Sequence, residues 1–94
     1  MYLIFYHKKV VQEDIPRLGE NTRRAIKKAI ETRLTEMPEL YGKPLRKSLA
    51  GYRKLRVGNY RVIFKIRGME VRILIIAHRK EVYALAEARG GKES

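Results

Sequence analysis

Two runs of strand-forming residues joined by a glycine–asparagine pair constrain the fold of this chain more than any other feature. They occupy residues 51–64, with Gly58 and Asn59 between them. This dipeptide suits the positive φ angles of a two-residue hairpin turn. The sequence therefore predicts an antiparallel hairpin in which Val57 pairs with Tyr60.

That register sorts the hairpin into two faces, because successive side chains of a strand point to opposite sides. One face is expected to be apolar, with Leu55, Val57, Tyr60, Val62, Phe64 and Ile66. The other is expected to be basic, with Tyr52, Lys54, Arg56, Arg61, Ile63 and Lys65. Arg56 would lie directly opposite Arg61, and like charges in such a pair destabilise a sheet. We interpret this cost as a sign of an anion-binding surface.

Basic residues are concentrated around the hairpin. Residues 40–69 contain nine Lys or Arg and no Asp or Glu, and the chain of 94 residues has a formal net charge of +12. This balance favours a polyanionic partner: nucleic acid, an anionic membrane surface or an acidic protein. The 45% hydrophobic content predicts a packed globule, and the length suits one domain over residues 1–94.

The chain begins with a predicted strand and a short helix. Residues 2–6 are aromatic or branched, which favours a strand. Val10 starts a helical pattern that should end near Ile15, because the interior of a helix does not tolerate Pro16.

A longer amphipathic helix is predicted after Gly19. Its apolar residues recur at helical spacing over about four turns, and its lysines and arginines are interpreted mainly as a solvated outer face. Asn21 or Thr22 is the candidate N-cap, and the helix should end before Pro38. Residues 39–50 have no periodic pattern and are expected to form a loop.

The third strand of the sheet is expected over residues 71–78. It is nearly all apolar, which suggests a central strand covered on both faces. If residues 67–70 form a four-residue turn, Arg61 lies opposite Ile76 and His78 points to the basic face. A bulge would reverse that assignment.

A short helix over residues 80–88 and an unstructured tail over 90–94 are expected to complete the chain. The predicted order is β-α-α-β-β-β-α. Helices grouped ahead of an antiparallel sheet indicate an α+β fold with the helices packed on one face.

Few catalytic templates fit these residues. Cysteine is absent, the basic segment has no carboxylates to hold a metal ion, and there is no Gly-rich phosphate loop, so no metal or other cofactor is expected. What remains is metal-independent phosphodiester cleavage, in which the 2′-hydroxyl of RNA attacks its own phosphate. This reaction needs a base, fixed positive charge and an acid. The candidates are Lys54, Arg56, Arg61, His78, Arg79 and Tyr83. Any one of them alone would be an ordinary surface residue, so the hypothesis depends on their conjunction.

Two segments, residues 51–64 and 78–83, resemble the RelE/ParE superfamily of bacterial and archaeal type II toxins. The opening strand and residues 14–18 and 41–45 are also similar to family members, so the resemblance covers almost the whole chain. It implies a small microbial RNase-like fold: a twisted antiparallel sheet with two helices on one face and a basic groove on its concave side.

The resemblance also implies a function. RelE-type members enter the ribosomal A site and cut mRNA there, whereas ParE-type members poison DNA gyrase and lack the catalytic set. The family's functional positions match five residues here: Lys54, Arg56, Arg61, Arg79 and Tyr83. A second lysine of RelE corresponds to Tyr52, and His78 is a further candidate for acid or base work.

By analogy, Lys54 is expected to act as the base or as an electrostatic activator, and Arg61 with Arg56 to hold the charge of the phosphorane. Tyr83 would stack on a nucleobase of the RNA or help to protonate the leaving oxygen. The expected phosphate-binding residues are Lys43, Arg46, Lys47, Arg53, Lys65 and Arg79.

The partners implied by the resemblance are the ribosome, mRNA and a cognate acidic, RelB-like antitoxin, with operator DNA bound only through the antitoxin complex. The apolar start of the chain is too short for a transmembrane span and lacks a secretory pattern, so a cytoplasmic location without membrane binding is expected. The alternatives are a ParE-like gyrase inhibitor without nuclease activity and a plain nucleic-acid-binding module.

Overall fold

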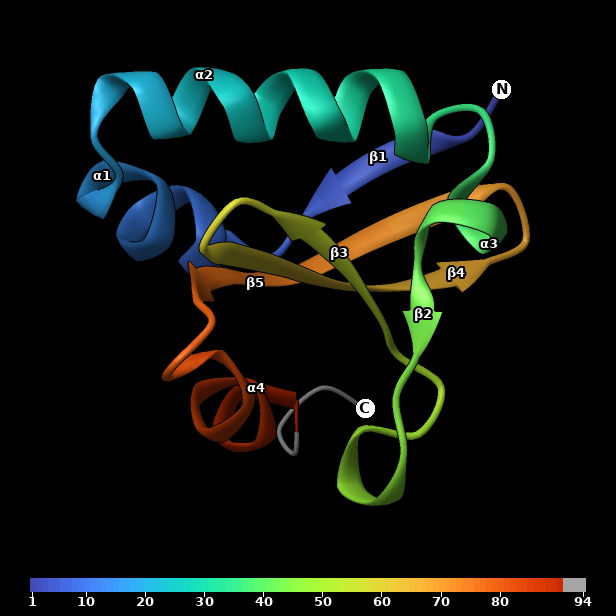
Figure 1. Ribbon diagram of the computed structural model, residues 1–94. Helices are drawn as coiled ribbons and strands as arrows, with labels where there is room; N and C mark the ends of the chain where they lie inside the picture. The colour runs from blue at the N-terminus through green and yellow to red at the C-terminus, as the bar shows by residue number, and fades with distance from the viewer. Residues whose placement is uncertain (91–94) are drawn as a thin grey trace.

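The computed structural model describes residues 1–90 and is built around a five-stranded sheet (Figure 1). The strand order is β1-β5-β4-β3-β2. The bounds are Leu3–Tyr6 for β1, Lys43–Pro44 for β2, Arg53–Val57 for β3, Tyr60–Arg67 for β4 and Glu70–His78 for β5. The α+β class is confirmed. The expectation of a fully antiparallel sheet is wrong at one edge, because β1 pairs in parallel with β5.

The predicted hairpin register is confirmed. Val57 lies opposite Tyr60, and Arg56 lies opposite Arg61. Gly58 takes a φ of 59°, which a residue with a β-carbon adopts only at a steric cost. The turn chemistry of the sequence therefore set the pairing of β3 with β4.

A bulge interrupts the pairing of β4 with β5. Ile63 lies opposite Ile75, but the next residue, Phe64, lies opposite Ile73. Leu74 is thus an extra residue in β5. A bulge of this kind reverses which side of the sheet the following side chains face.

The bulge decides where His78 points. Arg61 lies opposite Ala77 rather than Ile76, and His78 lies opposite Tyr60. Tyr60 packs with the apolar face of the hairpin. The expectation that His78 points to the basic face is therefore wrong, and the alternative with a bulge is correct.

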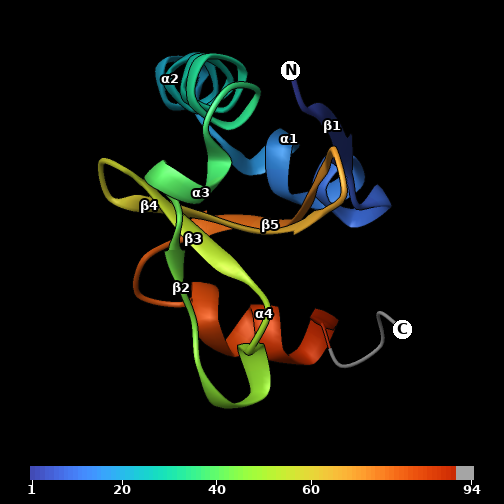
Figure 2. The ribbon, with the colours of Figure 1, turned by 90° about the vertical axis from the view of Figure 1, so that its right-hand side faces the viewer.

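Helices cover both faces of the sheet (Figures 1 and 2). On one side lie the π-helical turn η1, the short helix α1, the helix α2 and its π-helical continuation η2; their bounds are Val10–Asp14, Ile15–Arg17, Glu20–Ala29 and Ile30–Leu34. On the other side lies α4, Val82–Gly90. The structure thus has two helical arms on one face, as expected: the first is η1 with α1, and the second is α2 with η2. The C-terminal helix lies on the opposite face.

The segment expected to be a loop, residues 39–50, contains short regular elements. These are part of the helical turn α3, Pro38–Tyr41, the edge strand β2 and the 3₁₀ turn η3, Lys47–Leu49. Each has four residues or fewer, too short to produce a periodic sequence pattern, which is why the prediction missed them.

The first helical arm continues past Pro16 to Arg17, so the expected end near Ile15 is wrong. The turn before the proline widens, and the Ile15 N–H donates to the Val10 carbonyl, five residues back. Pro16 then lies in the first turn of α1, where the missing N–H is tolerated.

The second arm begins at Glu20, with Gly19 as its N-cap, rather than after Asn21 or Thr22. The Arg23 N–H donates to the Gly19 carbonyl at 2.8 Å, so the backbone itself forms the first helical bond. Among residues 1–90, no side chain caps this end of the helix.

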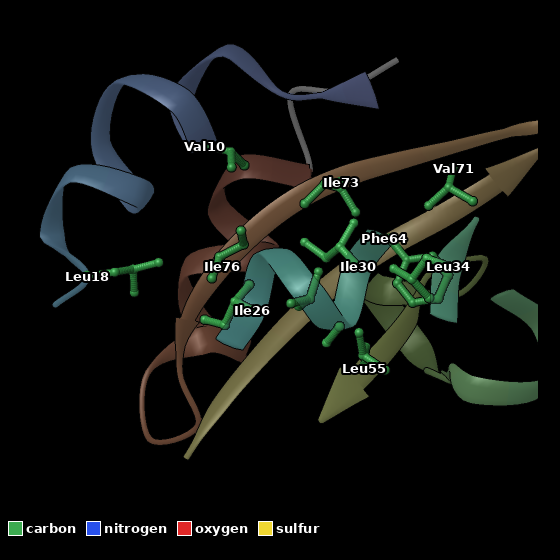
Figure 3. Close-up of a cluster of buried hydrophobic side chains, with 12 residues drawn as sticks. Val10, Leu18, Ile26, Ile30, Leu34, Leu55, Phe64, Val71, Ile73 and Ile76 are labelled. Carbon is green, nitrogen blue, oxygen red and sulfur yellow. The ribbon is translucent and has the colours of Figure 1, made fainter. Parts of the chain in front are cut away.

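Two apolar clusters lie on opposite faces of the sheet. The first packs between the sheet and α2 with its neighbours (Figure 3): Val10, Leu18, Ile26, Ala29, Ile30, Leu34, Leu55, Val62, Phe64, Val71, Ile73 and Ile76. The second packs between the sheet and α4: Leu49, Ile63, Leu74, Ile75, Ala77, Val82 and Ala86. Strand β5 contributes to both clusters, which confirms it as a central strand covered on both faces.

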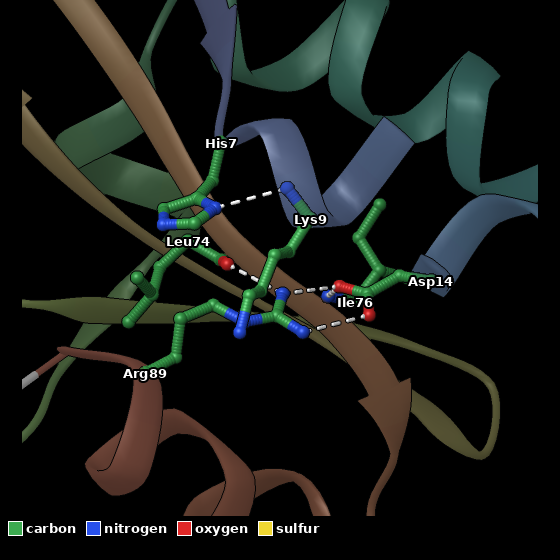
Figure 4. Close-up of polar contacts among 6 residues, drawn as sticks. All are labelled: His7, Lys9, Asp14, Leu74, Ile76 and Arg89. Atoms are coloured by element: carbon green, nitrogen blue, oxygen red, sulfur yellow. Dashed lines mark hydrogen bonds and ion pairs between the residues drawn. The ribbon is translucent and has the colours of Figure 1, made fainter. Parts of the chain in front are cut away.

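A buried ion pair joins the two sides of the molecule (Figure 4). Arg89 in α4 donates to both carboxylate oxygens of Asp14 in η1, at 2.7 and 3.1 Å. The side chains are only 11% and 4% exposed. Bidentate geometry and burial make this a strong interaction.

The same two side chains complete the edge of β5. Strand β1 ends at Tyr6. Beyond it, Leu74 and Ile76 have no strand neighbour on that side within the described part of the chain. Arg89 donates to the Leu74 carbonyl at 3.0 Å, and the Ile76 N–H donates to Asp14 at 3.0 Å. The ion pair thus satisfies backbone groups that would otherwise be buried without partners.

The C-terminal helix extends to Gly90, so that residue belongs to α4 and not to the expected tail. Residues 91–94 of that prediction lie outside the described residues. The expectation of one domain over residues 1–94 stays a prediction. Within residues 1–90, no helix is both long and apolar enough to cross a membrane.

We predict that Asp14→Asn destabilises the fold by about 3–5 kcal/mol, because it leaves the charge of Arg89 buried without a counterion. Urea denaturation followed by circular dichroism measures this loss.

The matched control is Glu20→Gln, which removes the carboxylate of an exposed pair with Arg24. That variant should change stability by less than about 1 kcal/mol. Similar small losses in both variants would show that the buried pair contributes little.

Candidate functional site

The basic face is the side of the sheet that carries α4, and it is defined by Lys54, Arg56, Arg61 and Lys65. Lys54 lies opposite Ile63, and the Ile63 side chain belongs to the cluster beneath α4. Alternation along β3 and β4 then places the other three cations on the same side. The predicted separation of the hairpin into an apolar and a basic face is confirmed.

Lys54 and Tyr83 come together across the space between the sheet and α4. The Lys54 Nζ lies 5.6 Å from the centroid of the Tyr83 ring, within the range of a cation–π interaction. Tyr83 is half-buried in the first turn of α4 and packs against the second apolar cluster. The docking of α4 therefore brings a phenol to the strand lysine.

The Arg61 side chain is held beside the turn of the hairpin. Its Nη1 donates to the carbonyls of Gly58 and Tyr60 at 3.0 and 2.9 Å. Arg56 lies opposite Arg61 and is exposed. Lys54 is the diagonal neighbour of Arg61 on the same face. Diagonal neighbours lie roughly 7–8 Å apart, within reach of long side chains. Lys54, Arg61 and Tyr83 thus share one side of the sheet.

Two expected phosphate-binding lysines also lie on this face. Lys43 in β2 is opposite Lys54, which makes a second like-charge pair beside Arg56 and Arg61. Lys65 lies farther along β4, with its Nζ 5.3 Å from the centroid of the Tyr52 ring.

The loop cations lie next to α4. Arg46 and Lys47 are exposed, and Lys47 has a φ of 57°, which is uncommon for a residue with a side chain. The adjacent Ser48 hydroxyl donates to Glu87 of α4 at 2.6 Å, which ties this loop to the helix.

Arg79 extends the ladder beyond β5. Its N–H donates to the Asn59 carbonyl at 2.8 Å. Arg79 is exposed in the turn that follows β5, and this bond places its backbone beside the hairpin turn.

His78 lies on the opposite face from Lys54 and Arg61. Its ring packs edge-on against Tyr60 at 5.5 Å, and its Nδ1 accepts a hydrogen bond from the Lys80 N–H at 3.1 Å. The bulge at Leu74 is the reason, since it shifts the alternation of β5 by one residue. His78 is therefore removed from the candidate catalytic set.

Arg53 also departs from the expectation. It alternates with Leu55 and so faces α3, where its Nη1 donates to the Gly42 and Glu39 carbonyls at 2.9 and 3.4 Å. The last carbonyls of a helix have no hydrogen-bond donor within the helix, and here the Arg53 guanidinium donates to them. Its position is explained by this capping role, and it is removed from the expected phosphate-binding set.

The pair of Asp14 and Arg89, which holds α4 and with it Tyr83, was not predicted from the sequence. One signal was present: Asp14 falls on the same stripe as Val10, where an apolar residue is expected. A carboxylate at such a position requires a buried partner. Among residues 1–90, no group of three or more His, Asp or Glu is placed to hold a metal ion.

Comparisons with known proteins agree with the fold of this chain. A family model described as the ParE toxin of the type II toxin–antitoxin system, parDE, matches residues 4–83. No curated protein matches the chain.

Several solved toxin structures are similar to the chain. A chain of the toxin–antitoxin complex RelBE2 from Mycobacterium tuberculosis is 30% identical, with a TM-score of 0.77, over 83% of this chain and 98% of that one. A chain of the RelB–RelE antitoxin–toxin complex from Methanococcus jannaschii is 25% identical, with a TM-score of 0.66, over 86% and 96%. The isolated RelE toxin of E. coli, at 21% identity and a TM-score of 0.71 over 95% and 98%, supports the fold alone.

We predict that Arg56→Thr stabilises the fold by about 0.2–1 kcal/mol, because it removes a like-charge pair and places a good strand former opposite Arg61. The gain should shrink at high salt, where the repulsion is screened. Urea denaturation at low and high ionic strength measures both effects.

Arg67→Thr is the comparison variant, because Arg67 lies on β4 opposite Glu70 and so belongs to a pair of opposite charges. It should give no stabilisation. A loss of stability in Arg56→Thr would contradict the interpretation that this pair is a cost to the sheet.

Proposed function

Because the chain belongs to the ParE toxin family of type II toxin–antitoxin systems, within the RelE/ParE superfamily, we propose that it is a toxin that cuts mRNA. The proposed activity is a ribosome-dependent, metal-independent endoribonuclease acting in the A site. The observation that carries it is the gathering of Lys54, Arg61 and Tyr83 on one face of the sheet.

The proposed reaction is an internal transfer at one phosphate. The 2′-hydroxyl oxygen attacks the adjacent phosphorus and loses its proton, the bond to the 5′-oxygen breaks, and that oxygen takes up a proton. The products are a 2′,3′-cyclic phosphate and a 5′-hydroxyl. Charge builds up on the phosphate oxygens in the transition state, and fixed cations stabilise it.

Lys54, Arg56, Arg61 and Tyr83 each have a proposed role in this reaction. Arg61, with Arg56 opposite it, holds the charge of the phosphorane. Lys54 acts at the 2′-hydroxyl as base or electrostatic activator. Tyr83 stacks on a nucleobase of the RNA or protonates the leaving oxygen. Its contact with Lys54 supports a substrate position that the two side chains share.

Five further cations are proposed to bind phosphates along the RNA strand. They are the exposed Lys43, Arg46, Lys47 and Arg79 and the half-buried Lys65. Contacts to phosphate orient a nucleic acid without identifying its sequence. The choice of codon would then come from the ribosome, which holds the mRNA.

An antitoxin is the proposed second partner. The similar complexes from M. tuberculosis and M. jannaschii each contain a toxin and an antitoxin. With a net charge of +12, this chain suits an acidic, RelB-like protein that covers the basic face. Operator DNA would be bound through that complex, and a cytoplasmic location follows from the ribosomal target.

We predict that Arg61→Ala lowers the cleavage rate by about 10²–10³-fold, because it removes a fixed charge from the transition state. Primer extension on mRNA in a translating extract measures the cuts. Arg24→Ala on α2, on the far side of the sheet, is the charge-matched control and should cut normally. Unchanged cutting by Arg61→Ala would eliminate the assignment.

His78→Gln tests the corrected site. Because His78 lies against Tyr60 on the other face, this variant should keep most of the cleavage activity. A loss as large as that of Arg61→Ala would return the histidine to the catalytic set.

The second candidate is a DNA gyrase inhibitor without nuclease activity, favoured by the ParE description of the matching family model. It predicts failed supercoiling or DNA breakage in a gyrase assay while mRNA stays intact. Running both assays on the same preparation separates the two functions.

A further inference from the structure

A row of two cations between two aromatic rings crosses the basic face at the end remote from the hairpin turn. Arg72 in β5 lies between Phe5 in β1 and Lys65 in β4. Tyr52 precedes Arg53, which pairs with Phe64, so Tyr52 continues the row beside Lys65. We name these four residues, Phe5, Arg72, Lys65 and Tyr52, the aromatic–cation row.

Each cation of the row lies over the aromatic ring next to it: Arg72 over Phe5 and Lys65 over Tyr52. The Arg72 Cζ is 5.5 Å from the centroid of Phe5, and the Lys65 Nζ is 5.3 Å from that of Tyr52. The row lines a cavity of about 370 Å³, to which His7 and Lys8 also contribute. Phe5 is 42% exposed, so part of its side chain remains accessible from solvent beside Arg72.

The charges of the row favour an anion. Lys65 and Arg72 are directly opposite, the third like-charge pair on this face. Glu70 accepts from the Nε and Nη2 of Arg72 at 3.0 and 2.7 Å, and so offsets one of the two charges. Within residues 1–90, Lys65 has no carboxylate partner, and Lys8 adds a further charge to the cavity.

We propose that this cavity is a second nucleotide subsite for single-stranded RNA. Lys65 and Arg72 hold one phosphate, and the adjacent base stacks on Phe5. Sites for single strands combine cations along the backbone with aromatic rings for the bases, and the row supplies both. The assignment rests on the proposed function, because it treats the basic face as an RNA-binding surface.

The position of the cavity fits a strand that also reaches the proposed cleavage site. Lys65 is four residues from Arg61 on the same face of β4, roughly 13 Å at 3.3 Å per residue. An oligonucleotide of a few residues can occupy both places. The subsite would thus anchor RNA on one side of the bond that is cut.

The test measures binding of a fluorescent hexaribonucleotide whose 2′-hydroxyls are methylated, so that cleavage cannot occur. Lys65→Gln/Arg72→Gln should weaken binding about tenfold and reduce the slope of log affinity against log salt by about 0.7, the value for one phosphate of a single strand. Phe5→Leu should weaken binding about fivefold through lost stacking and leave the salt slope unchanged.

The matched control is Lys27→Gln/Lys28→Gln, which removes two exposed charges from α2 on the other side of the sheet. It should change affinity by less than about twofold, because distant surface charges are screened. Equal losses in the two double variants, or full affinity in Phe5→Leu, would overturn the subsite.

Two further outcomes are informative. Displacement of the hexamer by AMP at a similar concentration would overturn the assignment to a strand and identify a free nucleotide as the ligand. A wild-type protein that binds the hexamer with the predicted sensitivities but never cuts mRNA would support the subsite while eliminating the nuclease.

Discussion

The buried ion pair between Asp14 and Arg89 is the interaction on which the arrangement of this molecule depends. It lies where β1 stops and β5 continues, and it satisfies backbone groups of Leu74 and Ile76 that have no strand neighbour there. It also ties the first helical arm to α4 across the edge of the sheet. Because α4 carries Tyr83, a contact remote from the hairpin helps to set the distance between that ring and Lys54.

Both faces of the sheet carry an apolar cluster, but they differ in the charges that surround it. One buries apolar side chains against α2, and this face supplies much of the packing. The other places like charges opposite each other three times, in the pairs Lys43–Lys54, Arg56–Arg61 and Lys65–Arg72. Each such pair weakens the sheet slightly, and stability given up at one surface is a common feature of functional sites. Binding of a polyanion along this face would relieve all three repulsions at once.

The family relationship identifies the chain as a toxin. The target of the toxin depends on the side chains of the site. The matching family model is described as a ParE toxin, whereas the similar solved structures include RelE toxins. One fold can carry both activities, so it is the side chains of the site and not the topology that distinguish RNA cleavage from gyrase inhibition. The proposed nuclease activity rests on the proximity of Lys54 to Tyr83, with Arg61 on the same face.

The sequence by itself determined the hairpin, its register and its two faces, because a tight turn and a period of two are local properties that a few residues encode. It also indicated the amphipathic helix and the central strand. Only the tertiary structure decided the side of His78, since one extra residue at Leu74 reverses the alternation. It likewise decided the capping role of Arg53 and the pairing of Asp14 with Arg89, residues 75 positions apart. These features depend on which segments meet in space, and no local pattern records that.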